Sequence, residues 1–502
     1  MGVYLALSPL LLITFGGCGL MLAEAFSRLR HDAVEGQSPS SDLALGSAVC
    51  LFAAALVTMG VWMVGPEHIE GIKALEPYIL LDRFTLFFTF VICIGGALSS
   101  MLAGGYLPEH GMDRGEFYPL ILFSALGCII LAAAGDLLSL FIGLETMSLG
   151  VYALTGFRRT SVKSAEAAIK YFLLGSFAAA LLLYGGALLY GATGHTDLAG
   201  LGKALAAGDR ALPLPMVIFG FVLVLVGLAF KVSAVPFHMW APDAYEGAPT
   251  PAMSFMAVAV KSAAFAMMLR VLLGSFADER FSSWSSGWPP VLAFLALATM
   301  TVANLIAGRQ ESVKRMLAYS SVAHAGYVLI GVVVAGKSGM TADGEASVLL
   351  YLLTYTVSTA GAVGALILMG SKGLEAVSFD DLSGIGRRHP AAAMAMSFFL
   401  LSLAGVPPSA GFFAKLNIFR GAVGAGYYWL AVLGIINSVI GAYYYLRVMV
   451  YMYMREPAPG APVAIPMKSG IVTAALVVAA LFVLYLGLTP GTSLSLALQA
   501  AS

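Results

Sequence analysis

Long apolar runs, each close to 20 residues, alternate with short polar segments along almost the whole chain. A run of that length suits a helix that crosses a hydrocarbon layer of roughly 30 Å, whereas a barrel strand would be about half as long and would alternate. About fourteen runs can be counted, and they begin near residues 4, 43, 84, 117, 136, 165, 213, 251, 288, 315, 346, 391, 425 and 467. The pattern predicts an all-α polytopic membrane protein.

Composition agrees with this fold class. The chain is 60% hydrophobic and 11% charged, and its mean hydropathy is +0.89. These values exclude a soluble globular protein. The first run, Tyr4 to Phe26, lacks a basic leader and a small-residue cleavage site, so we expect a retained span rather than a signal peptide.

Basic residues are distributed unevenly between the loops of the two sides. With fourteen spans, the side that holds the first loop carries 14 of the 27 Lys and Arg residues, Lys314 and Arg315 among them, and the other side carries 8. Because basic residues favour the cytoplasmic side, both termini are predicted outside the cytoplasm. The other five fall inside predicted spans, and they are Lys170, Lys231, Lys261, Lys415 and Arg447.

Lys231 is the most informative of these five residues. It lies in the apolar stretch GLAFKVSAVPFHMW, and Pro236 follows it closely. A charge near the centre of a bilayer costs roughly 2.5 to 3.5 kcal/mol, so an intramembrane lysine indicates function. Proline breaks a helix, and broken helices at membrane depth occur where they line a buried polar cavity. We therefore predict a functional site at this break.

A second stretch, LSLAGVPPSAGFFAKL, repeats the theme later in the chain. Pro407 and Pro408 break the helix and Lys415 follows the break, whereas Lys231 precedes its own. The internal likeness is weak in sequence, although two interrupted helices in corresponding halves are typical of inverted-repeat transport folds. Lys261 lies near the middle of another span, too deep to reach the interface easily, among small residues that suit close helix packing.

The remaining candidates each leave two interpretations open. Glu145, about nine residues into its span, is either part of an ion path or a structural hydrogen-bonding group. Lys170 is either part of the path or a lysine that reaches for the interface. His324 is either a relay member or a satisfied core histidine. Arg447 does not deprotonate usefully, which favours a structural or electrostatic role.

Nothing in the sequence indicates a bound cofactor. Paired histidine ligands for a membrane haem are missing, and there is no dinucleotide fingerprint, phosphate-binding loop or cysteine cluster. The four cysteines, Cys18, Cys50, Cys93 and Cys128, all lie in predicted spans without metal-site spacing, so we interpret them as inert core residues. We predict no cofactor of the chain's own.

Five stretches together resemble a known family. They are LLSLFIGLETMSL, SAEAAIKYFLLGS, GLAFKVSAVPFHMWAPDAYEGAPTP, KRMLAYSSVAHAGY and LSLAGVPPSAGFFAKL. The chain is similar over nearly its whole length to the antiporter-like membrane subunits of bacterial NADH:quinone oxidoreductase (complex I), and most of all to the subunit N family. A lysine at position 415 argues against the M type, which has glutamate there, and the end at Ser502 argues against the longer L type.

The resemblance implies a fold of two inverted five-helix repeats. These repeats would occupy residues 117–275 and 288–455, with extra helices in 1–116 and 456–502. It also implies a proton path, whose residues are Glu145, Lys231, Lys261 and Lys415. Lys170 and His324 are added from their positions in the sequence as weaker candidates for the entry path and the central relay.

The resemblance further implies a location in the bacterial inner membrane with both termini in the periplasm. NADH, FMN, iron–sulphur clusters and quinone would bind elsewhere in the complex, and the partners would be other membrane-arm subunits, among them further antiporter-like ones, the peripheral redox arm and the lipid bilayer. Nucleic acid is not expected. Two rival functions remain open, namely a subunit of a multisubunit sodium/proton antiporter and a structural spacer of the membrane arm.

Overall fold

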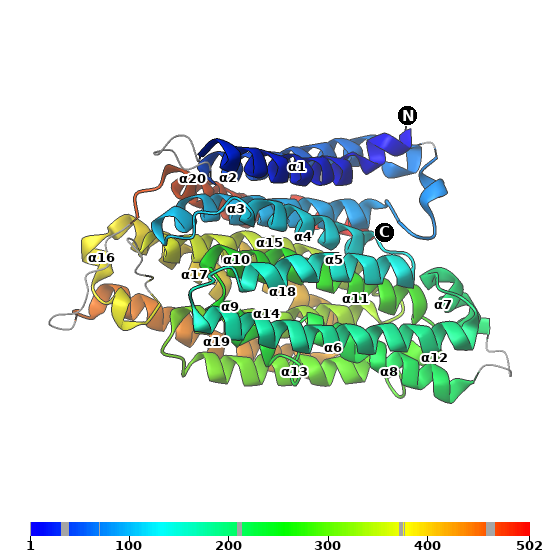
Figure 1. Cartoon of the computed structure of the whole chain (residues 1–502). Helices are drawn as coiled ribbons and strands as arrows, with labels where there is room; N and C mark the ends of the chain where they lie inside the picture. Colours follow the sequence, from blue (N-terminus) through cyan, green and yellow to red (C-terminus); the bar gives the residue numbers. More distant parts are fainter. Residues whose placement is uncertain are drawn as a thin grey trace.

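The computed structural model describes residues 2–31, 40–69, 71–207, 213–370, 375, 377–457 and 467–501. Within these ranges the chain forms helices joined by short loops, and extended pairing is limited to isolated bridges. Figure 1 shows the long helices lying side by side as one layered bundle. Both termini lie at the same end of the bundle, which we call the terminal end; the opposite end, which carries α16 (Ile385–Arg388), is the distal end (Figure 1).

The chain passes back and forth between these two ends. The first helices are α1 (Gly2–His31), α2 (Ser40–Val64) and α3 (Arg83–Glu109). The next group is α4 (Phe117–Ala133), α5 (Leu137–Thr155), α6 (Val162–Thr193), α7 (Leu198–Ala207), α8 (Leu214–Lys231), α9 (Trp240–Gly247), α10 (Thr250–Phe255) and α11 (Lys261–Ser275). After the short α12 (Glu279–Ser282) come α13 (Trp288–Ala307), α14 (Val313–Ala335), α15 (Thr341–Leu368), α17 (Pro390–Ala404), α18 (Ala410–Gly424), α19 (Tyr428–Met454), α20 (Gly470–Leu488) and α21 (Pro490–Ala501).

The fold class predicted from the sequence is confirmed, but the count of about fourteen spans is not. A helix occurs close to every predicted start, and 12 helices of the described residues are long and apolar enough to cross a membrane. The other two predicted spans coincide with α4, which has 17 residues, and α17, which has 15. A break shortens α17, and α18 continues beyond it.

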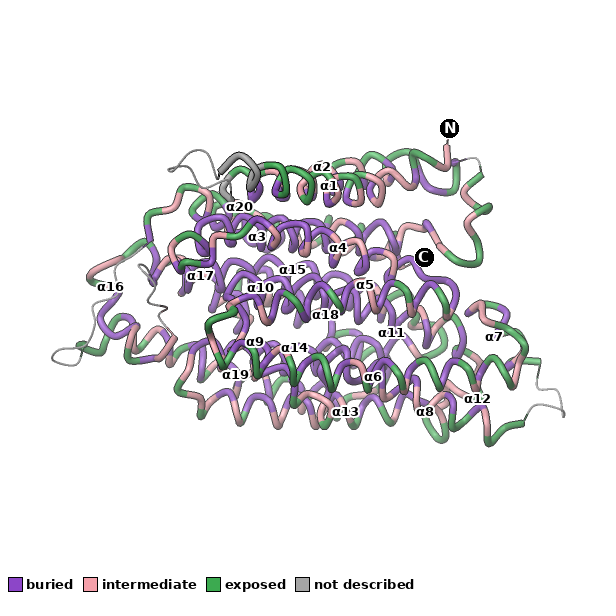
Figure 2. Tube along the Cα trace, in the orientation of Figure 1, coloured by how far each residue is buried: buried purple, intermediate pink, exposed green. Residues whose placement is uncertain are grey.

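The helices divide into a buried centre and an exposed rim. α3, α14, α15 and the segment 250–275 are almost entirely enclosed, whereas α1, α6, α13, α19 and α20 expose apolar side chains (Figure 2). Lipid tails are as apolar as leucine, so the rim needs no polar surface, and the polar groups can gather inside. The centre is therefore where a buried polar path has room to run.

Both predicted breaks are present, and both helices end in the same way. After α8 the N–H of Ala234 donates to the carbonyl of Ala229 at 2.8 Å, and after α17 the equivalent bond, donated by Val406, measures 3.1 Å. In each case the preceding residue has a positive φ, 61° at Ser233 and 84° at Gly405. This is the Schellman ending of a helix. The two breaks thus share a backbone geometry that cannot be recognised from their sequences.

Close packing fixes α5, which carries Glu145, against α4. A Cβ added to Gly127 of α4 would lie 2.3 Å from the backbone nitrogen of Met147, and one added to Gly143 of α5 would lie 2.7 Å from that of Leu131. Small residues on both helices let the backbones approach. Any larger side chain at either glycine would push α5 away from the centre.

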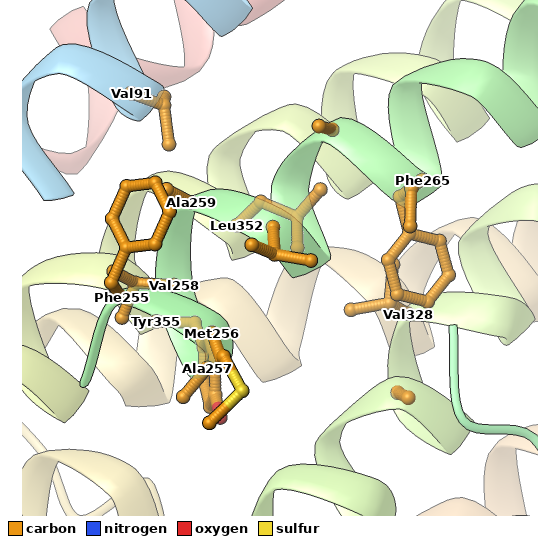
Figure 3. Close-up of a cluster of buried hydrophobic side chains, with 14 of the residues drawn as sticks. Val91, Phe255, Met256, Ala257, Val258, Ala259, Phe265, Val328, Leu352 and Tyr355 are labelled. Atoms are coloured by element: carbon orange, nitrogen blue, oxygen red, sulfur yellow. The ribbon is translucent and has the colours of Figure 1, made fainter. Parts of the chain in front are cut away.

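A π turn interrupts the helix that carries Lys261. Residues Met256–Val260 form it between α10 and α11, and Lys261 follows directly. Figure 3 shows the π turn buried among apolar side chains, near Val91 of α3 and Leu352 and Tyr355 of α15. π turns are rare and occur often at functional sites.

Candidate functional site

Lys231 is the last residue of α8, directly before the first break. It is 3% exposed, and its Nζ donates a hydrogen bond of 2.8 Å to Oγ of Ser148 in α5. The ammonium also lies 5.9 Å from the ring centre of Tyr152 on the same helix. The carbonyl of Phe230 accepts the backbone N–H of Ser233 at 3.0 Å and also a bond of 3.1 Å from the indole N–H of Trp240. Another group therefore serves this helix end, and Lys231 is left to face α5.

Glu145 lies one helical turn before Ser148 and is partly exposed on this chain. Within the described residues no ion pair or hydrogen bond joins its carboxylate to Lys231. The interaction expected between these two residues is therefore not a direct contact, because the lysine is bound to the next turn of α5. The two groups still share one face of the helix, since positions three apart are neighbours on its surface.

Lys261 lies in the enclosed centre of the bundle. It is 3% exposed and donates to both the carbonyl and the hydroxyl oxygen of Ser321 in α14. Its Nζ lies 5.6 Å from the ring centre of Tyr355 in α15, and Tyr245 of α9 lies beside Ser321. The ammonium is therefore held by neutral oxygens and an aromatic face rather than by a carboxylate.

His324 is bound at both ring nitrogens. Nδ1 lies 2.7 Å from the hydroxyl of Tyr351, and Nε2 lies 2.9 Å from that of Tyr445, which also bonds to Ser320. The ring is 4% exposed. A hydroxyl donates one hydrogen bond and accepts others, so each neighbour of this imidazole can pass a proton on. The structure places His324 inside a polar network rather than in an apolar core.

Lys415 lies in α18, beyond the second break. Its Nζ donates to the carbonyl oxygen of Ala404, at the end of α17, and to Oγ of Ser438 in α19, both at 2.9 Å. The ammonium also lies 5.2 Å from the ring centre of Tyr327. A cation at a helix C-terminus is favoured by the helix dipole. This lysine therefore supports the broken helix as well as carrying a charge into the centre.

A small cavity joins two of the candidate positions. Its walls include both His324 and Lys415, together with Tyr351, Tyr355 and Ser402. The ring of Tyr355 also lies beneath the ammonium of Lys261. Lys261, His324 and Lys415 thus converge on one hydroxyl-lined region, although they come from α11, α14 and α18.

Lys170 does not join this buried region. It is about half exposed and forms ion pairs with Glu166 at 2.7 Å and with Asp243 of α9 at 3.0 Å. Arg315 also binds Asp243, at 2.9 Å, and Glu246, at 2.8 Å. Burial alone would raise the pKa of Asp243, but the hydrogen bonds from Lys170 and Arg315 hold it below its usual value. Lys170 belongs to an ion-pair network near the distal end.

Arg447 stabilises the end of another helix. It donates to the carbonyl oxygens of Gly308 at 3.0 Å and Gln310 at 2.9 Å, just beyond α13. Its guanidinium also lies 4.3 Å from the ring centre of Phe379. These contacts satisfy backbone carbonyls that the helix end leaves open. The structure thus gives Arg447 a supporting role.

Sequence reasoning missed Lys314 and the hydroxyl partners of the lysines. Lys314 was placed in a loop, but it is the second residue of α14 and is 2% exposed. Helical spacing could have found it, because Lys314 lies seven residues before Ser321 and positions seven apart fall on one helix face. The hydroxyl partners, Ser148, Ser321 and Ser438, carry no signal of their own in one sequence, since Ser is common in packed membrane helices.

No group of three or more His, Cys, Asp or Glu that could hold a metal ion occurs within the described residues. The four cysteines are free thiols, with Cys93 and Cys128 buried and Cys18 and Cys50 partly buried. What the site offers is a series of titratable groups joined by hydroxyls.

Comparison with known proteins identifies the family. The sequence pattern described as NADH:quinone oxidoreductase/Mrp antiporter, TM, matches residues 134–441. A relative from Sorangium cellulosum (strain So ce56), NADH-quinone oxidoreductase subunit N 1, is 67% identical over 503 aligned positions, which cover 100% of this chain and 99% of the relative.

Solved structures agree. A chain of respiratory complex I from Thermus thermophilus with bound aureothin is 33% identical, has a TM-score of 0.76 and aligns over 97% of this chain and 98% of its own length. A chain of the Mrp complex from Dietzia sp. DQ12-45-1b has a TM-score of 0.83 over 99% of this chain and 97% of its own, but at 22% identity that likeness shows the fold alone. The chain therefore belongs to the subunit N family of NADH-quinone oxidoreductases.

Proposed function

We propose that this chain carries out a proton translocation step in the membrane arm of a NADH:quinone oxidoreductase. The observation that carries the proposal is that three buried lysines, Lys231, Lys261 and Lys415, have no carboxylate partner within hydrogen-bonding distance among the described residues. An ammonium enclosed by neutral groups is costly to keep charged, so it can release a proton at little cost. A lysine fixed in a strong ion pair would not.

The path begins at α5 and crosses the centre of the bundle. Glu145 acts on Lys231 from one turn away and sets its proton affinity. The proton then reaches Lys261, passes through the hydroxyls around His324 and leaves from Lys415. The hydrogen bonds of His324 to two tyrosine hydroxyls support this order, because they extend the polar region between the last two lysines.

The redox chemistry would belong to other subunits of the complex. We propose that NADH, FMN, iron–sulphur clusters and quinone bind there, and that energy released by quinone reduction drives the proton step in this chain. The direct partners would be other antiporter-like subunits in the same lipid bilayer. The boundaries at residues 116–117, 275–288 and 455–456 would separate the two repeated halves from the flanking helices.

We also propose an orientation in the membrane. Both termini lie at the terminal end, and the loops richer in Lys and Arg join helices at the distal end (Figure 1). Because basic residues favour the cytoplasmic side, the distal end would face the cytoplasm and the termini the periplasm. Arg210 and Lys372, which entered the charge count, lie outside the described residues.

The decisive variant is Lys261→Arg in the purified native complex. Arginine keeps the charge but does not deprotonate usefully, so assembled complex should reduce quinone with NADH at a low coupled rate and pump poorly. The measurements are complex content by native gel, NADH-driven quinone reduction and proton uptake by vesicles. Parent-like pumping by assembled Lys261→Arg complex would overturn the relay.

The same variant separates the proposal from its rivals. A purely structural spacer predicts unchanged pumping in assembled complex. A subunit of a sodium/proton antiporter predicts purification without redox subunits, and sodium-dependent proton movement that does not need NADH. The 67% identical relative, named as subunit N of NADH-quinone oxidoreductase, favours the redox-coupled function.

A further inference from the structure

A buried polar cluster at the distal end lies outside the path just described. It combines His110 at the end of α3, Thr250 at the start of α10, Lys314 at the start of α14 and Glu375 in the segment after α15. These four residues are far apart in the sequence. The fold brings them together because the ends of all four helices lie at the distal end (Figure 1).

Glu375 is the centre of this cluster. One of its carboxylate oxygens accepts a hydrogen bond of 3.0 Å from Thr250 Oγ1, and the other lies 3.6 Å from Nζ of Lys314. The lysine also donates to the carbonyl of Ala248, at the end of α9, at 3.0 Å. An acid and a base are therefore held next to each other in an enclosed site.

Two hollows meet at this pair. The inner one is small, with a volume of about 10 Å³, and is lined by His110, Thr250, Lys314 and Glu375. The outer one, about 110 Å³, shares Lys314 and Glu375 and extends to Lys163, whose side chain is mostly exposed. Nε2 of His110 is buried and has no hydrogen-bond partner within the described residues. An open polar atom on a polar cavity is typical of a place for water.

One face of α14 connects the cluster with the centre of the bundle. Lys314 and Ser321 are seven residues apart, which is almost two full turns, and His324 lies one turn further. Ser321 accepts hydrogen bonds from Lys261, and Tyr245 lies beside it. Lys314, Ser321 and His324 thus define a stripe of polar positions roughly 15 Å long, from the distal end to the relay, with Leu317 and Ala318 between the first two.

We propose that Glu375 and Lys314 form the proton-uptake site of this subunit, an inference that rests on the proposed function. A proton from water in the outer hollow moves to the carboxylate of Glu375. The carboxylic acid then gives that proton to the neutral amine of Lys314, which passes it along the stripe to the neutral amine of Lys261. Each transfer leaves the donor ready for the next proton, and no other reactant is needed.

The charges around the site suit this role. Burial raises the pKa of Glu375 to about 7, so its carboxyl can both gain and lose a proton near neutral pH. Burial, together with the nearby charge of Arg158, lowers the pKa of His110 to about 4, so this imidazole stays neutral and can bind water. The other groups that face the site are Lys314, Lys163 and Glu246, and the last two are ion-paired with each other at 2.8 Å.

Two conservative variants test the inference. Glu375→Gln keeps the size and the hydrogen bond with Thr250 but cannot titrate, and Lys314→Arg keeps the charge and the bond with Ala248 but does not deprotonate usefully. Each should assemble and lower NADH-driven proton pumping about tenfold or more. Glu311→Gln is the matched control, because Glu311 is an exposed acid next to α14 at the same end; its pumping should equal that of the parent.

The pH dependence of the pumping rate would not change if Glu375 had only a structural role, so it tests the titration of this residue. The parent should lose pumping rate as the pH on the uptake side rises through about 7, because fewer Glu375 carboxyls then hold a proton. Glu375→Gln should pump slowly with no such step. Parent-like pumping by both Glu375→Gln and Lys314→Arg, or an unchanged pH step in the glutamine variant, would overturn the uptake site.

A separate experiment with Val377→Cys tests whether the two hollows are accessible from the distal side of the membrane, since Val377 lines both of them. A membrane-impermeant, negatively charged methanethiosulfonate reagent is added to sealed vesicles of each orientation, and pumping is compared before and after labelling of the same sample. Block should occur from the distal side only, and the parent with its four native cysteines should not respond. Absence of block from the distal side would also overturn the inference.

Lys261→Arg, assayed in parallel, distinguishes an error in the uptake site from an error in the relay of the proposed function. If that variant fails to pump while Glu375→Gln and Lys314→Arg pump normally, only the uptake site is wrong. If Lys261→Arg itself pumps normally, the relay of the proposed function is wrong.

Discussion

At the first break the carbonyl of Phe230 accepts both the backbone N–H of Ser233 and the indole N–H of Trp240, and Lys231 reaches across to Ser148. At the second break Lys415 itself donates to the carbonyl of Ala404, the last residue of α17. Both helices nevertheless finish with the same backbone hydrogen bond. The candidate proton carrier thus binds the broken helix end at the second break, whereas at the first break the side chain that binds the helix end is the neutral indole of Trp240.

This difference separates carrying a charge from holding a helix end. Lys415 does both, because its ammonium satisfies the last carbonyl of α17 and interacts favourably with the dipole of that helix. Lys231 is free of the second task. The difference between the two lysines also explains their order relative to proline. Lys415 follows its prolines because a lysine can reach back to a helix end only from beyond the break, whereas Lys231 precedes Pro236.

The largest expected effect is the difference in stability and assembly between Lys415→Ala and Lys231→Ala. Both variants should lose pumping, but Lys415→Ala should also destabilise the chain by about 1 to 3 kcal/mol, because a buried carbonyl loses its donor. Lys231→Ala should keep more of the complex assembled. Complex content on native gels and the thermal midpoint of purified complex measure the difference.

Equal losses of assembly in the two alanine variants would break the comparison. Lys415→Glu sharpens it, because a protonated glutamic acid can still donate one hydrogen bond and can titrate. We expect partial pumping, above that of Lys415→Ala. If the alanine variant pumps at least as well, titration at this position is the wrong account.

Lys231→Arg should affect pumping and leave the structure almost unchanged. The guanidinium can still donate to Ser148 but does not release a proton on a useful timescale. Assembly should be near that of the parent, and proton uptake should fall about a hundredfold. Quinone reduction measured with and without an uncoupler, at matched complex content, checks this; a parent-like proton gradient would show that Lys231 need not deprotonate.

Glu145→Gln should have a smaller effect. Because no direct ion pair joins Glu145 to Lys231 in the described structure, the amide removes a charge without leaving the ammonium unbound. Assembly should be unaffected, and both pumping and coupled NADH oxidation should fall. Normal pumping by assembled complex would remove Glu145 from the path.

The smallest effect concerns the left-handed residues of the two breaks. Ser233→Gly should be neutral or slightly stabilising, since glycine adopts the φ of 61° without strain. Gly405→Ser should destabilise by about 1 kcal/mol or more, because a Cβ there is strained and would lie 3.0 Å from the side chain of Lys415. Thermal midpoints of the two complexes give the comparison, and equal shifts would contradict it.

The sequence predicted the helices and both breaks because apolar length and proline are local signals. It also found Lys231, Lys261 and Lys415, since a lysine inside an apolar run is conspicuous wherever the helix is placed. It did not show that Ser148 rather than Glu145 is the hydrogen-bond partner of Lys231, because a difference of one helical turn depends on how α5 and α8 pack. Lys314 was missed because it lies at a helix start that resembles a loop, and Glu375 was missed because it lies in a loop whose partners come from distant segments.

The π turn before Lys261 sets the rotational phase of the helix that follows. An α-helix advances by about 100° per residue, so removing the one extra residue that such a turn accommodates would swing everything after it by about that angle. The ammonium of Lys261 would then leave Ser321 and point toward another wall of the bundle. The five buried residues Met256–Val260 therefore fix the direction in which the side chain of Lys261 points. That direction depends on the winding of the backbone as much as on the hydrogen bonds of the lysine.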